Sequence, residues 1–274
     1  MKKSDLFIHC IQAYKKYNNF NHLYNRIDIL KDQDVDCNPV GIMPTEYPIV
    51  IKPIINIINN DYDTVLTKMS NKTEYMAYLK EHVYKNNSLC GNFWYSGING
   101  NHYISNLLIK NGKVVFNDTF LIHKNADDMP SFYKHVYDYI ITDYLSETIS
   151  ILMNSYSGAA CIQFIDNIII DCRLSWWEEN HIFKRYSDLV SCIPVFLEHN
   201  KPLRMLTDDI VYIPFRKDVE DNKNYINELK YFLVDYNIVF KNKIHNNVNQ
   251  ICMFIINWDK LNDVLAIRGK LGLF

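Results

Sequence analysis

The segment from Gly158 to Trp177 constrains the fold of this chain more than any other, because it carries polar side chains into a run that is otherwise apolar. Its pattern predicts two short strands joined at Asp166-Asn167, a pair that tolerates left-handed turn geometry. Strands this apolar are expected at the centre of a core, so polar groups within them need partners there. The polar residues are Gln163, Asp171 and Arg173.

Two arrangements satisfy these polar groups, and the sequence leaves both open. In the first, Asp171 and Arg173 are two apart on one strand, share a face and form a structural ion pair. In the second, the carboxylate, the carboxamide of Gln163 and the guanidinium gather at one end of the hairpin to hold a metal ion and phosphates.

The length of the hairpin loop decides whether Gln163 and Asp171 share a face. A two-residue turn would pair Gln163 with Ile170, and Gln163 and Asp171 would then lie on opposite faces. A three-residue loop over 166–168 would pair Gln163 with Asp171 and place Arg173 two residues further along the same face. We predict the three-residue loop, because only this register gives the buried amide and carboxylate a common partner.

Composition places the chain among folded globular proteins and excludes several kinds of partner. With 48% apolar and 22% charged residues, its 274 residues can form a sizeable core. A net charge of −2 supplies no strong signal for nucleic acid. The seven cysteines show no spacing suited to zinc, so we expect reduced, mostly buried thiols. The apolar runs are too short for a signal peptide or a membrane span, which predicts a cytoplasmic protein without a membrane partner.

The remaining pattern predicts an α+β protein built mostly of antiparallel sheets with flanking helices. Strands are expected at 47–55, 89–97, 102–109, 114–122, 192–197, 209–215 and 251–257. Two helices separated by a break at Asn18-Asn19 are expected over 6–30, and further helices over 72–85, 224–235 and 259–267. A long helix is expected to begin at Pro130-Ser131 and to run to Leu152. We divide the chain into an N-terminal helical segment (1–46), a core (47–200) and a C-terminal α/β segment packed on the core (201–274).

Lys52 is the unusual residue of the strand predicted at 47–55. A lysine in so apolar a strand either lies at a sheet edge with its ammonium in water or points into a cleft. We predict that Lys52 points into a cleft between the antiparallel strands expected at 89–122 and the central hairpin, because its strand is too apolar to be an exposed rim.

Three stretches of the chain, taken in their order and spacing, carry a resemblance to a known family. The first is Tyr47-Pro-Ile-Val-Ile-Lys52-Pro53, the second runs from Phe93-Trp94-Tyr95-Ser96 to Lys113, and the third is the hairpin from Ala160 to Arg173. Together they resemble the ATP-grasp fold of carboxylate-amine ligases and their viral and tailoring relatives. The core at 47–200 is therefore expected to be ATP-grasp-like.

The resemblance implies ATP and Mg²⁺ as cofactors, with roles carried over position by position. Lys52 would place its ammonium on the nucleotide phosphates and Arg173 would take a phosphate oxygen, so both are expected to be catalytic. Gln163 and Asp171 would be the metal ligands. Besides Lys52, the nucleotide-binding residues would be Phe93, Trp94, Tyr95, His102 and Asn106.

The sequence also departs from the family pattern. The segment from Ile54 to Val65 has no glycine, although the family has a glycine-rich phosphate loop there. Gln163 stands where a carboxylate is usual and Arg173 where an asparagine is usual, and a guanidinium repels a magnesium ion. Two hypotheses stay open: a divergent nucleotide-binding ligase, and a catalytically degenerate relative that acts as a binding or scaffolding module in a viral complex.

The origin and the partners of the chain are less constrained. Its abundance of Lys, Asn, Ile, Tyr and Asp is what A/T-rich codons favour, and it resembles that of proteins from A/T-rich large DNA viruses. A viral origin would place the protein in the host cytoplasm. Besides the nucleotide, we expect a second substrate or a protein partner that the sequence does not identify.

Overall fold

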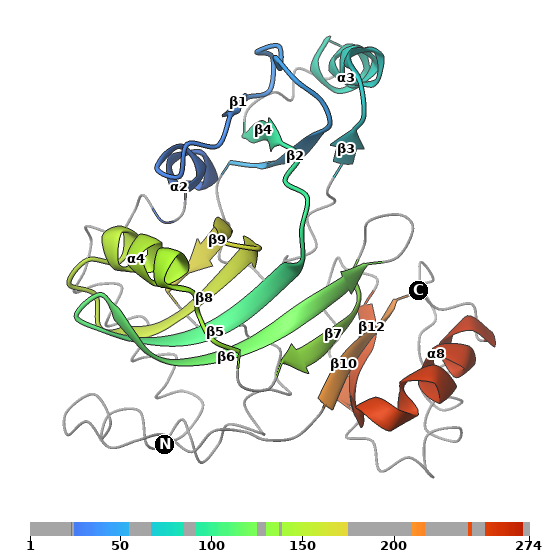
Figure 1. Ribbon diagram of the computed structural model, residues 1–274. Coiled ribbons are helices and arrows are strands. Elements are labelled where there is room, and N and C mark those ends of the chain that lie inside the picture. The colour runs from blue at the N-terminus through green and yellow to red at the C-terminus, as the bar shows by residue number, and fades with distance from the viewer. Residues whose placement is uncertain are drawn as a thin grey trace. The chain divides into compact units, whose positions relative to one another are not determined.

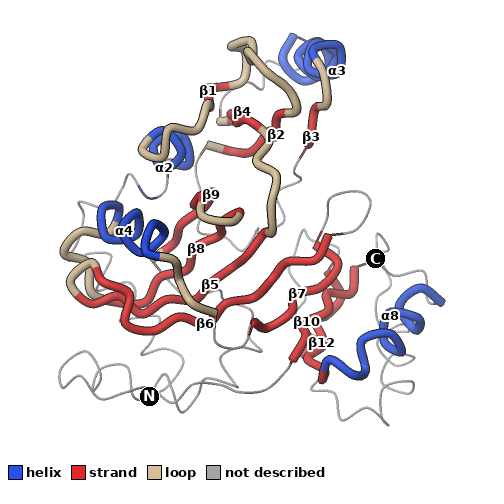
Figure 2. Tube along the Cα trace, viewed as in Figure 1, coloured by secondary structure: helices blue, strands red, loops and turns tan. Residues whose placement is uncertain are grey.

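The chain folds into two compact units in the computed structural model (Figure 1). The first unit comprises Met1–Asn117 and Ile140–Trp177, and the second comprises Asp118–Tyr139 and Glu178–Phe274. The structure describes residues 23, 25–54, 67–84, 91–124, 130–136, 139–174, 210–216, 241–242 and 250–270. Among the regular elements of the described chain, strands hold more residues than helices in both units (Figure 2).

A small antiparallel sheet in the first unit has the strand order β1-β4-β2-β3. Its strands are β1 (Cys37–Pro39), β2 (Ile49–Pro53), β3 (Thr67–Met69) and β4 (Asn92–Ser96). Residues of helix α2 (Arg26–Lys31) pack with one face of this sheet, around Val50 and Tyr95. Helix α3 (Lys72–Tyr78) and the π-helix Leu79–Tyr84 pack with the other face, around Ile51. Alternation along β2 and β4 thus fills a core on each side.

The central hairpin belongs to the larger sheet, whose order in the first unit is β6-β5-β8-β9. Its strands are β5 (His102–Lys110), β6 (Lys113–Lys124), β8 (Gly158–Ile165) and β9 (Ile168–Arg173). Asn111 and Gly112 form the turn between β5 and β6 with φ of 49° and 76°, the left-handed geometry that an Asn-Gly pair favours in a tight hairpin. Strand β6 crosses the boundary between the units after Asn117.

In the second unit the strand order is β6-β7-β10-β12-β11. Its further elements are β7 (Pro130–Val136), β10 (Ile210–Arg216), β11 (Lys241–Asn242), β12 (Gln250–Asn257), a 3₁₀ turn (Trp258–Lys260) and α8 (Leu261–Lys270). The guanidinium of Arg268 in α8 donates to the backbone oxygen and the hydroxyl of Ser131 in β7, at 2.8 and 2.7 Å.

The long helix expected from Pro130 to Leu152 is wrong. Residues 130–136 form β7, and helix α4 covers only Asp143–Leu152, with Thr142 as its N-cap. Tyr133 and His135 are buried and alternate with more exposed neighbours, which is the period of a strand. Strands β6 and β10 pair with β7 on its two sides, so distant pairing overrides the helical spacing of the apolar residues.

Most other elements agree with the sequence. The expected strands at 47–55, 89–97, 102–109, 114–122, 209–215 and 251–257 and the helices at 72–85 and 259–267 are confirmed. The short strands β1 and β3 were not expected, because their sequences are polar. The expected elements at 6–22, 192–197 and 224–235 lie outside the described residues, and the three-part division of the chain stays a prediction. Among the described residues no helix has the length and apolar character needed to cross a membrane.

Candidate functional site

Helix α2 delivers an arginine to the buried polar cluster of the first unit. Asn25 caps this helix, its side-chain oxygen accepting from the backbone N–H of Ile27 at 3.1 Å. The side chain of Arg26 is 3% exposed. Its Nη1 donates to the backbone oxygen of Pro53 at 3.0 Å, and its Nη2 lies 2.7 Å from Oδ2 of Asp171. Arg26 therefore links the end of β2 to β9.

Lys52 lies in the interior of the small sheet, not at its edge. Strand β2 stands between β4 and β3, and Lys52 is only 5% exposed. The alternative of a solvated edge lysine is therefore wrong. Its ammonium is close enough to Asp171 to lower the pKa of that carboxyl.

The central hairpin has the turn length of one predicted register and the residue pairing of the other. The turn has two residues, since Ile165 pairs with Ile168, so the expected three-residue loop is wrong. A β-bulge at Ile170 then shifts the register, and Gln163 nevertheless lies opposite Asp171. The shared face of Gln163 and Asp171 is thus confirmed by a different local structure.

The geometry of the Asp166-Asn167 turn explains why the unpaired residue, Ile170, lies in β9 and not in the loop. Asp166 adopts a φ of 50°, which aspartate tolerates in the left-handed region. Its backbone N–H donates to the oxygen of Asn101, and its Oδ1 accepts from the N–H of Asn101, both at 3.0 Å. These bonds hold the tight turn, so the odd residue is accommodated further along β9.

Three cationic side chains act on the carboxylate of Asp171. Burial alone would raise the pKa of Asp171, but Arg26, Lys52 and Arg173 together lower it below its ordinary value. The carboxylate is therefore ionised among three cationic groups. All four side chains belong to residues that are no more than 9% exposed.

Arg26 is the residue that the sequence analysis missed. Asp171 makes its 2.7 Å ion pair with this arginine, so the pairing of Asp171 with Arg173 alone does not describe the cluster. A signal was present, because Arg26 follows Leu23 by three positions and precedes Leu30 by four. Both leucines are fully buried, so the arginine lies on the apolar stripe of its helix. A charge on such a stripe needs a buried partner.

The aromatic residues expected beside the nucleotide divide between two faces of β4. Phe93 lies opposite Lys52 and shares its face with Tyr95, and the two rings stack with their centroids 5.9 Å apart. Trp94 points to the other face, where its Nε1 donates to the backbone oxygen of Ile42 at 2.8 Å. The structure brings Phe93 and Tyr95 to the face of Lys52 and does not bring Trp94 there.

His102 and Asn106 both lie on the face of the larger sheet that carries Gln163. Ile104 pairs with Gln163, and His102 and Asn106 are each two residues from Ile104 along β5. They are buried, with 8% and 1% of their surfaces exposed. The sheet thus groups these two residues with the acid and the amide of the hairpin.

The donor set of this cluster does not fit a magnesium ion. A divalent cation of this kind takes oxygen ligands, above all carboxylates. Among the described residues no group of three or more His, Cys, Asp or Glu side chains is placed to hold a metal ion. Asp171 is already paired with Arg26, and Lys52 and Arg173 add further positive charge. The assignment of Gln163 and Asp171 as metal ligands stays a prediction.

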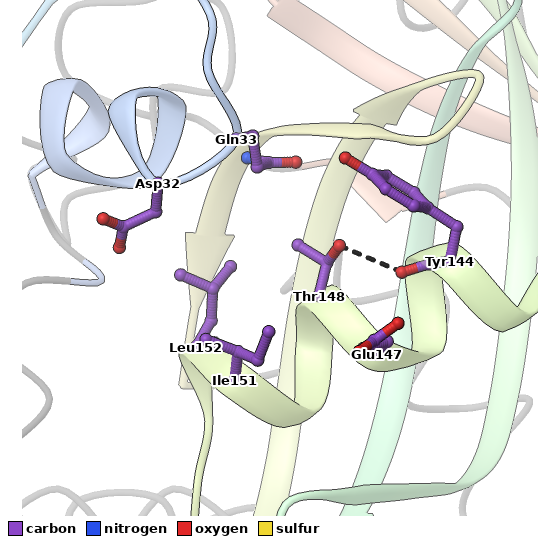
Figure 3. Close-up of a pocket in the computed structure, with 7 residues that line it drawn as sticks. All are labelled: Asp32, Gln33, Tyr144, Glu147, Thr148, Ile151 and Leu152. Atoms are coloured by element: carbon purple, nitrogen blue, oxygen red, sulfur yellow. Dashed lines mark hydrogen bonds between the residues drawn. The ribbon is translucent and has the colours of Figure 1, made fainter.

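A surface pocket of about 260 Å³ lies beside α4 and the end of α2 (Figure 3). Seven residues line it: Asp32, Gln33, Tyr144, Glu147, Thr148, Ile151 and Leu152. The charged groups among them are the carboxylates of Asp32 and Glu147. A pocket with two acids and no cation in its lining does not suit phosphate groups, so we place the candidate site at the buried cluster instead.

The two antiparallel sheets of the first unit, with Lys52 on one and the Gln163–Asp171 pair on the other, define an α+β, ATP-grasp-like fold. Several solved structures of low sequence identity share this fold. One is N5-carboxyaminoimidazole synthetase from Staphylococcus aureus complexed with ADP, with 11% identity, 90% of this chain and 71% of that chain covered, and a TM-score of 0.61. Another is L-amino acid ligase from Bacillus licheniformis, with 8% identity, 91% and 71% covered, and a TM-score of 0.57.

A third similar structure is carboxyaminoimidazole ribonucleotide synthase from Aspergillus clavatus complexed with ATP. It has 8% identity, 89% of this chain and 71% of that chain covered, and a TM-score of 0.59. Identities this low establish the fold alone. No protein-family model matches the sequence, and no curated protein matches it.

Proposed function

We propose that this protein binds a nucleoside polyphosphate at the buried cluster of Arg26, Lys52, Asp171 and Arg173. The observation that carries the proposal is Lys52, a buried lysine in the interior of its sheet whose charge acts on Asp171 of the facing hairpin. Two of the three similar structures named above are complexes with ADP or ATP. In the family that the sequence resembles, the lysine at the position of Lys52 contacts nucleotide phosphates.

The test is a thermal-shift panel of ATP, ADP, GTP and AMP-PNP, each with and without Mg²⁺. A ligand at about 100 times its dissociation constant stabilises the native state by roughly 2.7 kcal/mol, so binding would raise the melting temperature measurably. No shift with any nucleotide in either condition would overturn the proposal.

The Lys52→Ala variant should lose the nucleotide-dependent shift, because a phosphate-binding lysine contributes charge at the site. Lys113→Ala is the matched control. Lys113 is exposed and begins β6, just after the end of β5 that is opposite to His102. Equal shifts in parent and Lys52→Ala protein would mean that the nucleotide binds elsewhere. Circular dichroism of the variant checks that it folds.

Ligase chemistry is the second candidate function, favoured by the names of the similar structures. In that reaction ATP phosphorylates a substrate carboxylate and an amine attacks the acyl phosphate, while Lys52 and Arg173 stabilise the transferring phosphoryl group. ADP release in the presence of a mixture of carboxylates and amines, absent in Lys52→Ala, would support it. Nucleotide binding without ADP release from any mixture would favour the degenerate binding or scaffolding module.

The second substrate, any protein partner, the viral origin and the cytoplasmic location stay predictions. The simplest search for the second substrate measures the melting temperature of the ATP-bound protein with one added carboxylate at a time. A carboxylate that binds beside ATP should raise the melting temperature beyond the value for ATP alone.

A further inference from the structure

The surface pocket beside α4 is a second feature of the first unit that can hold a ligand, and it shares no residue with the buried cluster. Asp32 and Gln33 at the end of α2 line it on one side, and residues of α4 line it on the other (Figure 3). Its volume is about 260 Å³. Pockets that enclose a drug-sized ligand measure about 300–1,000 Å³, so this one suits a single long side chain better than a whole nucleotide.

The two walls of the pocket are fixed by contacts within the protein. Nε2 of Gln33 donates to the backbone oxygens of Ile29 and Ile169, both at 2.8 Å, and its Oε1 accepts from the N–H of Ile169 at 2.8 Å. These bonds attach the end of α2 to strand β9. On the other side, α4 is anchored by its buried residues Leu145 and Ile149. A pocket that is already formed costs less ordering free energy when a ligand binds.

Two exposed carboxylates at the pocket have no partner among the described residues. The side chains of Asp32 and Glu147 make no ion pair and no hydrogen bond there. Asp32 is also the C-cap of α2, where the helix dipole disfavours a carboxylate, so its charge does not serve the stability of that helix. The described residues that line the pocket include no lysine or arginine, since Lys31 in the last turn of α2 is not among them. The charge of the pocket is therefore complementary to a cationic group.

The outer face of α4 is apolar at this place, although the outer face of a surface helix is usually polar. Tyr144 and Ile151 are seven residues apart on one face of α4, and they are 54% and 69% exposed. Both line the pocket and still remain mostly exposed. Large apolar side chains exposed side by side are typical of a binding surface. A partner larger than one side chain would cover the apolar surface that the pocket leaves open.

We propose that this pocket docks a segment of another protein in which a lysine or arginine is flanked by apolar residues. The cationic group of that residue pairs with Asp32 and Glu147. Its aliphatic stem packs on Leu152 and on the ring of Tyr144, which attracts a cation as well. Long cationic side chains bury their stems on apolar surface and keep their charge near water, which matches apolar walls beside exposed acids.

The test is a ¹⁵N–¹H correlation titration of the full chain with three acetylated and amidated tripeptides. They are leucine-arginine-leucine, leucine-citrulline-leucine and glycine-arginine-glycine, and citrulline has nearly the shape of arginine without its charge. The first peptide should shift the backbone amides of 32–33 and 144–152 and should bind about fivefold or more tightly than either of the others. No shift at these amides, or equal affinity for the arginine and citrulline peptides, would overturn the proposal.

A double variant tests the two acids. Asp32→Asn combined with Glu147→Gln removes both charges at exposed positions and keeps the size of each side chain. It should bind the leucine-arginine-leucine peptide about fivefold or more weakly than the parent. Glu81→Gln is the matched control, because Glu81 is an exposed acid of the π-helix and does not line the pocket. Unchanged affinity of the double variant would show that the acids do not recognise the peptide and would overturn the proposal.

Two further measurements separate this proposal from other occupants. Agmatine carries the guanidinium of arginine without a peptide, and if it binds as tightly as the leucine-arginine-leucine peptide, the pocket is a site for small cations and the protein partner is overturned. Sedimentation equilibrium of the parent and of the double variant tests a second copy of this chain. A dimer that the double variant dissociates would overturn a separate partner, whereas a monomer in both, with agmatine the weaker ligand, supports one. None of these results depends on whether a nucleotide binds at the buried cluster.

Discussion

At the scale of single residues, Asp171 connects the stability of the first unit to its candidate function. Its carboxylate is buried, ionised and paired with Arg26 at 2.7 Å, and Lys52 and Arg173 act on it as well. Burying a charged side chain costs free energy, so such residues occur where an opposite charge pairs with them or where they take part in function. The cluster therefore stabilises the fold of the first unit whether or not a nucleotide is bound.

The pH dependence of folding should report on Asp171. Its pKa in the folded protein lies below its ordinary value of 3.8, so the unfolded chain takes up this proton first as the pH falls. The stabilisation is fully present above about pH 5 and is lost progressively as the pH drops below about 4. Urea denaturation between pH 3 and 7 measures it.

Asp171→Asn is the matched variant for that experiment. It should be less stable than the parent at neutral pH by about 3–5 kcal/mol, because Arg26 loses the carboxylate that neutralises it. Its free energy of unfolding should also fall less steeply between pH 5 and 3 than that of the parent. Parallel pH profiles for the two proteins would contradict the assignment of the shift to Asp171.

At the scale of elements, the loop before α4 joins a helix cap to the central hairpin. The hydroxyl oxygen of Thr142 accepts from the N–H of Leu145 at 3.2 Å, and the same hydroxyl donates to Oδ1 of Asn167 at 2.8 Å. Asn167 belongs to the two-residue turn between β8 and β9. The start of the helix and the turn of the hairpin are thus tied together by one side chain.

Thr142→Ala should destabilise the protein by about 1–2 kcal/mol, because it removes the cap of α4 and the bond to the turn. Thr142→Ser keeps the hydroxyl and should lose much less. Urea denaturation at neutral pH compares the three proteins. Equal losses for alanine and serine would show that the methyl group matters and that the hydroxyl does not.

The central hairpin has the predicted pairing of Gln163 with Asp171, but a different local structure produces it. We predicted that Gln163 and Asp171 share a face, because only that register gives them a common partner, and they do. We expected the extra residue in the loop, whereas it lies at Ile170 as a bulge. A three-residue loop, and a two-residue turn followed by a bulge, both place Gln163 opposite Asp171. The sequence alone therefore did not distinguish them.

At the scale of the whole molecule, three cysteines of the first unit are buried and are not in disulfides. They are Cys37, Cys161 and Cys172. Burial raises the pKa of the Cys37 thiol to about 11 and that of Cys172 well above its ordinary value. A neutral, buried thiol is a poor nucleophile, so these groups should react only when the unit opens.

Brief treatment of the native protein with N-ethylmaleimide at pH 7 should leave these three thiols unlabelled, and treatment in urea should label all three. Peptide mapping by mass spectrometry identifies the sites. A nucleotide that binds the first unit should slow the labelling at intermediate urea concentrations, because it stabilises the closed state. Rapid labelling of Cys172 in the native protein would contradict its burial.

The sequence by itself determined the elements whose cause is local. The Asn-Gly turn, the apolar strand around Lys52 and the two strands of the central hairpin follow from turn chemistry and from alternation, which act over a few residues. The same reasoning placed Gln163, Asp171, Arg173 and Lys52 among the buried polar groups, and the structure has all four buried.

Only the tertiary structure decided which distant groups meet. Arg26 and Asp171 are 145 positions apart, and their pairing depends on how α2 packs against the hairpin. Residues 130–136 became a strand because β6 and β10 pair with them, against their own helical spacing. Long-range contacts are set by the packing of whole elements, which no short window of sequence contains. Which charged groups surround Asp171 was therefore decided at that level.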